Sequence, residues 1–127
     1  MKPTVEVRLA EGPLHAAEPA VVDGAGAVLQ FEGVVRSLEG DEQITALQYE
    51  AYEPMTTREL TRLAEAVVQE HGLLAMRVEH SVGEVPVAKV SFRLTIGSVH
   101  RAEGLAAASE FIDRMKRDAP LWKTAVR

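Results

Sequence analysis

Two stretches of alternating apolar residues follow one another in this chain with no helical segment between them. One alternates from Met76 to Val82 and the next from Val90 to Ile96, with only a short break at residues 83–86. Alternation with a period of two is typical of strands that bury one face. Because consecutive strands recur without an intervening helix, the pattern favours a mixed α+β domain over a doubly wound fold.

Earlier segments add further strands to this pattern. Alternating apolar residues predict strands over 5–9, 27–35 and 47–51. The last two flank a polar loop at residues 37–43, and we expect them to pair as a long-looped hairpin. Residues 13–21 have room for a short helix before a turn.

Two long helices complete the expected order of elements. Apolar residues at helical spacing predict a helix over 54–71, which Gly72 would end. A second apolar stripe predicts a last helix, with Ser98 as candidate N-cap and an end before Pro120. The expected order is therefore β-(α)-β-β-α-β-β-α.

Composition limits the classes of function. With 127 residues, of which 46% are hydrophobic, we expect residues 1–127 to form a single domain. A net charge of −5 argues against general nucleic-acid binding. We see neither a leader pattern nor a long apolar run, and so expect a cytoplasmic protein. Since the chain has no cysteine, any sulfur chemistry must use sulfur brought by another molecule.

Four basic side chains are the candidate site residues. His100 and Arg101 stand at the expected start of the last helix, where free backbone N–H groups favour phosphate or carboxylate, although helix capping explains them equally well. Arg36 ends a strand, a place from which side chains often reach ligands, and a solvated charge is its plainer interpretation. Lys123 follows Trp122, and burial against this indole would lower the pKa of the lysine, unless it is an ordinary surface residue.

The sequence gives no pattern for a metal or a cofactor. His15, His71 and His80 lack the spacing of metal ligands, and we predict no metal site. No glycine-rich loop lies between a strand and a helix, which disfavours the common kinds of nucleotide binding.

Five short segments, in this order and spacing, resemble the large, catalytic subunit of molybdopterin synthase, the MoaE family. They are Phe31-Glu32-Gly33-Val34-Val35-Arg36, Leu47-Gln48-Tyr49-Glu50-Ala51-Tyr52 followed by Met55, Val82-Gly83-Glu84-Val85, Ser98-Val99-His100-Arg101 and Pro120-Leu121-Trp122-Lys123. Each segment alone is weak evidence, whereas five in register over about a hundred residues are specific.

The resemblance implies a fold, a partner and a reaction. The fold is an α/β hammerhead-type fold with an added antiparallel β subdomain, in a homodimer that becomes a heterotetramer with its partner. That partner is a small ubiquitin-like (MoaD-like) sulfur carrier, whose C-terminal Gly-Gly bears a thiocarboxylate. Sulfur passes from it to cyclic pyranopterin monophosphate, a pterin substrate, and forms the molybdopterin dithiolene without a cofactor.

By the same resemblance, Lys123 is the catalytic residue, and Arg36, His100 and Arg101 bind the substrate phosphate. Family members generally continue past this lysine with a second basic residue, which is missing here or replaced by Arg127. Two alternatives therefore stay open. One is a non-catalytic dimeric module that binds a ubiquitin-like partner, and the other is an unrelated α+β anion-binding domain.

Overall fold

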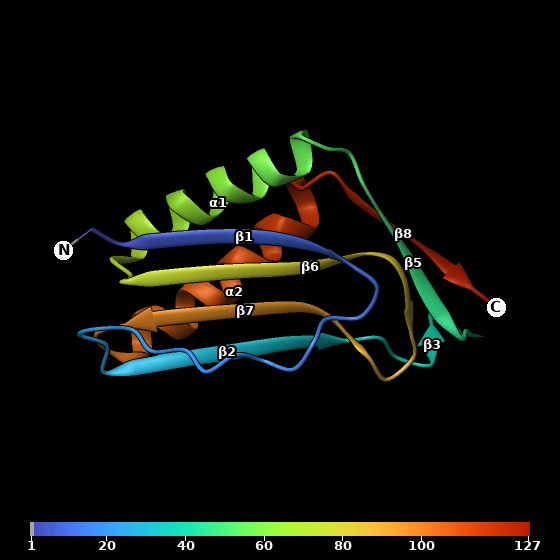
Figure 1. Ribbon diagram of the computed structural model, residues 1–127, viewed down its shortest axis with the longest axis horizontal. Helices are drawn as coiled ribbons and strands as arrows, with labels where there is room; N and C mark the ends of the chain where they lie inside the picture. Colours follow the sequence, from blue (N-terminus) through green and yellow to red (C-terminus); the bar gives the residue numbers. More distant parts are fainter. Residues whose placement is uncertain (1) are drawn as a thin grey trace.

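The computed structural model describes residues 2–127 and has a four-stranded sheet at its centre. The strands lie in the order β1 (Thr4–Glu11), β6 (Ala75–Pro86), β7 (Val90–Ser98) and β2 (Ala27–Val34) (Figure 1). β1 runs parallel to β6, and the other neighbours are antiparallel. The predicted α+β class is confirmed, since β6 and β7 follow one another directly.

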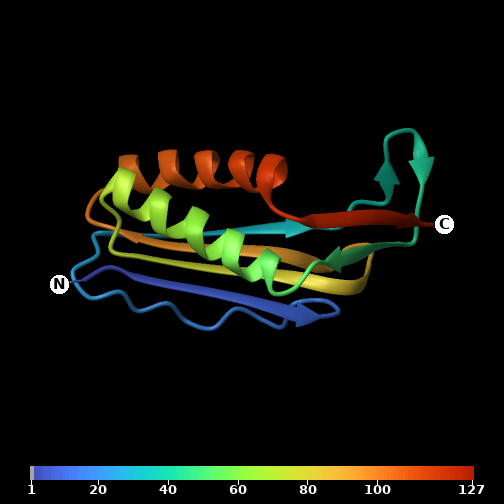
Figure 2. The same ribbon diagram turned by 90° about the horizontal axis from the view of Figure 1, so that it is seen from above.

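Two helices cover one face of this sheet, α1 (Met55–His71) and α2 (Arg101–Asp118) (Figure 2). Both predicted helices are therefore confirmed, and Gly72 ends α1 in the left-handed conformation that favours glycine. The N-cap of α2 is His100 and not Ser98, whose hydroxyl donates to the His100 carbonyl oxygen at 2.6 Å. The main core lies between helices and sheet; its fully buried residues include Leu60, Val67, Met76, Val78, Leu94, Ile96 and Phe111.

A smaller antiparallel unit extends the sheet at one end. The last residues of β6 pair with β5 (Ala46–Ala51), and β5 pairs in turn with β8 (Leu121–Val126). A short hairpin of β3 (Leu38–Glu39) and β4 (Glu42–Gln43) stands beside it (Figure 2). The expected hairpin of strands 27–35 and 47–51 is thus wrong, because β2 pairs with β7 while β5 pairs with β6 and β8.

Residues 12–26 cross the sheet face opposite the helices as an irregular strap (Figure 1). The short helix considered for residues 13–21 is absent, and Pro19, which would fall inside it, lacks the N–H group that a helix interior needs. The strap lies close to the sheet at Gly97, where a Cβ would come within 2.6 Å of the Val22 side chain. Only glycine allows this approach without a shift of the strap.

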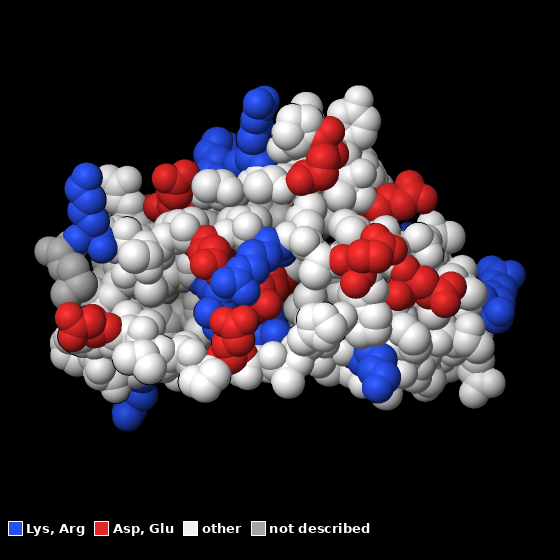
Figure 3. Space-filling view, viewed as in Figure 1, with Lys and Arg blue, Asp and Glu red and all other residues white. Residues whose placement is uncertain are grey.

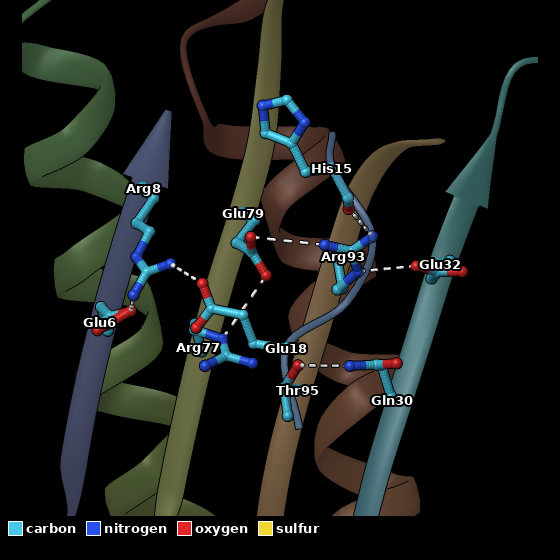
Figure 4. Close-up of polar contacts among 10 residues, drawn as sticks. All are labelled: Glu6, Arg8, His15, Glu18, Gln30, Glu32, Arg77, Glu79, Arg93 and Thr95. Atoms are coloured by element: carbon cyan, nitrogen blue, oxygen red, sulfur yellow. Dashed lines mark hydrogen bonds and ion pairs between the residues drawn. The ribbon is translucent and has the colours of Figure 1, made fainter. Parts of the chain in front are cut away.

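Ion pairs connect the strap with the strands beneath it. Arg93 of β7, only 3% exposed, donates to Glu32 of β2 at 2.7 Å and to the backbone oxygen of His15 at 2.7 Å (Figure 4). Its guanidinium also lies 3.6 Å from Glu79 of β6. At the centre of this face acidic and basic residues are intermixed (Figure 3).

Near the sheet edge, Arg8 of β1 forms ion pairs with Glu6 of the same strand and with Glu18 of the strap (Figure 4). We call this group, with Glu32, Arg77, Glu79 and Arg93, the open-face cluster.

In residues 2–127, neither helix combines the length and apolar character that a membrane span requires.

Candidate active site

A cavity of about 420 Å³ opens where α2 ends and the antiparallel unit begins. The last turn of α2 forms one wall, β8 and β5 form a second, and the end of β2 forms a third. Its lining residues are Phe31, residues 33–36, Glu39, Leu47, Tyr49, His80, Ser91, Phe92, Ile112, Met115, Lys116 and residues 121–123. Segments that are far apart in the sequence thus meet at one hollow.

Two of the four predicted site residues lie in this cavity. Arg36 follows the end of β2, and Lys123 is held on β8 opposite Tyr49 of β5. The Nζ of Lys123 lies 3.2 Å from a carboxylate oxygen of Glu39. Its side chain is 52% exposed, so the desolvation expected from Trp122 is not found. Lys123 nevertheless occupies an ordered strand that the sequence reasoning did not predict.

Lys116 is a cavity cation that the sequence reasoning missed. It lies in the last turn of α2, one helical turn after Ile112, and both residues line the cavity. This i, i+4 relation to the apolar stripe is the signal that could have revealed it. Arg36, Lys116 and Lys123 therefore face a cavity in which Glu39 supplies the only carboxylate of the described lining.

His100 and Arg101 lie at the other end of α2. A helix rises about 1.5 Å per residue, so roughly 24 Å separates this end from Lys116. Ser98 pairs with Ala27, the first residue of β2, whereas Arg36 lies beyond the last. Within one chain, then, the structure does not bring His100 and Arg101 together with Arg36 and Lys123.

Comparison with known families identifies the chain. A model described as the MoaE protein matches residues 9–118. The chain belongs to the MoaE family. The match includes Arg36, His100, Arg101 and Lys116 and ends before β8, so Lys123 lies outside it.

Curated MoaE relatives are molybdopterin synthase catalytic subunits. The one from Arabidopsis thaliana is 37% identical over 102 residues, which cover 80% of this chain and 52% of the relative. The human one is 34% identical, covering 80% and 54%. That of the archaeon Thermoplasma volcanium is 33% identical, covering 78% and 72%. The chain thus spans about half the length of the Arabidopsis and human relatives.

Solved structures share the MoaE fold. Molybdopterin synthase from Staphylococcus aureus matches with a TM-score of 0.83 at 24% identity, over 93% of this chain and 88% of the other. A Helicobacter pylori complex of subunits 1 and 2 of molybdopterin-converting factor matches with a TM-score of 0.74 at 22% identity, over 94% and 83%. At these identities the likeness concerns the fold alone.

Away from the cavity, His71 of α1 lies beside Glu110 of α2, a neighbour that its sequence spacing does not reveal. Potential ligand atoms of Glu70, His71 and Glu110 lie within 4.8 Å of one another. Arg114 already lies 3.3 Å from Glu70 and 3.4 Å from Glu110. The guanidinium supplies the positive charge that these carboxylates need, and the contacts join α1 to α2.

Proposed function

We propose that this chain is the catalytic subunit of a molybdopterin synthase, a sulfurtransferase. It would move two sulfurs to cyclic pyranopterin monophosphate, which becomes the molybdopterin dithiolene; each sulfur comes from the C-terminal thiocarboxylate of one small ubiquitin-like protein, and that terminus becomes a carboxylate with oxygen from water. In this proposal residues 1–127 act as one catalytic domain in the cytoplasm. The observation that carries it is the cation-rich cavity at the end of α2 in a chain of the MoaE family.

The charges of the cavity suit both reactants. Phosphate and thiocarboxylate are anions, and Arg36, Lys116 and Lys123 place three cationic groups against one carboxylate. Arg36 binds the phosphate, since a guanidinium presents paired N–H donors. Lys123 is the general acid/base, or stabilises charge that develops as sulfur leaves the partner's tail. The chain has no cysteine, which is consistent with a sulfur supply from the partner.

A second copy of the chain is needed if His100 and Arg101 are to reach the same phosphate. β2 is an edge strand of the described sheet, and Val28 and Val34 on it are about half exposed. Antiparallel pairing of two β2 edges about a two-fold axis would place the beginning of one β2 beside the end of the other. His100 and Arg101 of one copy would then lie near Arg36 of the other.

Two outcomes test the enzyme and its assembly. The purified chain should convert cyclic pyranopterin monophosphate to molybdopterin when a thiocarboxylated small subunit is added, and should sediment with twice the chain mass at micromolar concentration. Absence of conversion with an active partner would contradict the enzyme. A monomer across this concentration range would contradict the shared site.

Mixed dimers test the shared site directly. Lys123→Ala and the double variant His100→Ala/Arg101→Ala should each have little activity alone. Random exchange of subunits makes about half of the dimers hybrids, each with one complete site if the site is shared, so that about a quarter of the parent activity should return. If all four residues act within one chain, hybrids contain no complete site and mixing restores nothing.

A further inference from the structure

His80 lies in the wall of the cavity and has no part in the proposed chemistry so far. It follows Met76 and Val78 in the row of β6 residues that faces the helices, and is only 7% exposed. The core fills the first part of this row, whereas His80 borders the cavity beyond the last turn of α2. Part of the His80 side chain therefore borders the cavity.

The hydrogen bond of His80 fixes its tautomer. Nδ1 lies 2.8 Å from the backbone oxygen of Ser81, and a carbonyl oxygen only accepts, so the hydrogen of the neutral ring is on Nδ1. Burial lowers the pKa of His80 below the ordinary 6.5, and the bond to Ser81 only partly opposes this. At neutral pH, Nε2 is thus an acceptor, and none of the described residues donates to it.

Two aromatic rings flank the imidazole of His80. Tyr49 meets the imidazole edge-on with ring centres 5.0 Å apart, and Phe92 lies 5.9 Å away. The Tyr49 and Ser91 hydroxyls are 3.1 Å apart. Ser91 falls where the pairing of β2 with β7 shifts register, and such a bulge re-aims a side chain.

The charged groups that line the same cavity are Arg36, Lys116, Lys123 and Glu39. Three of them are cations, and Glu39 is paired with Lys123. A ligand that binds both the cations and Nε2 of His80 carries negative charge at one end. At the other end it carries an N–H donor on a flat ring, which suits the neighbouring aromatic rings. Pterins have such donors on their pyrimidine ring.

We propose that Nε2 of His80 accepts a hydrogen bond from a ring N–H of the pterin substrate and so orients the ring, while the cations hold its phosphate. This rests on the proposed function and assigns His80 as a positioning residue. A protonated His80 would lose the acceptor and add a fourth positive charge.

Two amide substitutions separate this role from packing. His80→Asn retains a donor near Nδ1 for Ser81 but has no atom at the Nε2 position, whereas His80→Gln places amide atoms there. We expect His80→Asn to weaken binding of cyclic pyranopterin monophosphate about three- to tenfold in calorimetry, the effect of one neutral hydrogen bond. His80→Gln should recover most of it, and His15→Gln, exposed on the strap, is the matched control. Binding of inorganic phosphate should be the same in all variants.

The pH dependence gives a second readout. Relative to His80→Asn, in which every other group of the site is unchanged, the affinity of the parent protein should be constant from pH 8 to about 6.5 and fall at lower pH, as Nε2 gains a proton. In turnover, His80→Asn should raise KM and leave kcat nearly unchanged. If the parent binds and converts the pterin and His80→Asn matches it at every pH, the inference is wrong and the proposed function stands. If the parent neither binds nor converts it, both are wrong.

Discussion

The open-face cluster and the cavity both contain basic and acidic side chains, but they differ in how many carboxylates face each cation. On the open face each of Arg8 and Arg93 contacts two carboxylates within 4 Å. In the cavity, three cations line the wall together with one carboxylate of the described lining, Glu39, which is paired with Lys123. Compensated charges of a buried network stabilise one arrangement of strands, whereas uncompensated cations beside a hollow leave capacity for an anion.

Exposure differs between the central cation of the open-face cluster, Arg93, and Lys123 of the cavity. Arg93 is 3% exposed and satisfied by protein atoms, while Lys123 is 52% exposed and has one ion pair. An exposed pair exchanges with solvent at little cost, so an incoming anion can displace Glu39 from Lys123. We therefore expect substitutions in the cavity to change activity and those in the open-face cluster to change stability.

The largest expected effect is on catalysis at Lys123. Lys123→Ala should lower single-turnover conversion of the pterin about 10²- to 10⁴-fold, because a positioned acid/base group is lost. Lys123→Arg should fail too, since guanidinium keeps the charge and hardly releases its proton. Affinity for the small subunit should change little, because one rim lysine contributes little to a wide interface. Lys2→Ala is the control, and conversion by Lys123→Ala at the parent rate would make Lys123 a surface lysine.

Arg93 should give the next largest effect, in stability. Arg93→Met removes the buried cation that pairs with Glu32 and the donor to the backbone oxygen of His15, and should lower the free energy of unfolding by about 3–5 kcal/mol, measured in urea. Adding Glu32→Gln should recover part of this loss, because the uncompensated charge of Glu32 is then removed, whereas Glu79 keeps Arg77 at 3.6 Å. Arg36→Met, at the exposed cavity rim, should change stability by less than about 0.5 kcal/mol. A similar loss in both arginine variants would contradict the contrast between the regions.

The sequence predicts the main elements because their signals are local. Alternation in β6 and β7 and the apolar stripes of α1 and α2 report burial on one face, and the structure confirms all four. Strand partners depend on contacts between distant segments, and the pairing expected for β2 and β5 was wrong. β8 was missed because residues 122–124 are exposed, so that no apolar alternation marks the strand.

The site residues could likewise be predicted only in part. Arg36 and Lys123 were candidates from their places in the sequence, the resemblance to the MoaE family assigned their roles, and the structure places both at one cavity. Lys116 was missed, because a basic residue in the last turn of a helix also fits simple pairing with the helix dipole. The separation of His100 and Arg101 from Lys116 follows from the length of α2 alone, whereas their separation from Arg36 depends on the pairing of β2 with β7.

The smallest expected effect sharpens the contrast within the open-face cluster itself. Arg8 contacts Glu6 at 2.7 Å and Glu18 at 3.7 Å, but the side chains of Arg8 and Glu6 are 45% and 48% exposed. Exposed pairs contribute about 0–1 kcal/mol, so Arg8→Ala should lower the free energy of unfolding by no more than this, and less at high salt. Urea unfolding at two salt concentrations, beside Arg93→Met, measures the difference. A loss from Arg8→Ala as large as that from Arg93→Met would mean that anchoring of the strap, and not burial of the charge, determines the stability of this face.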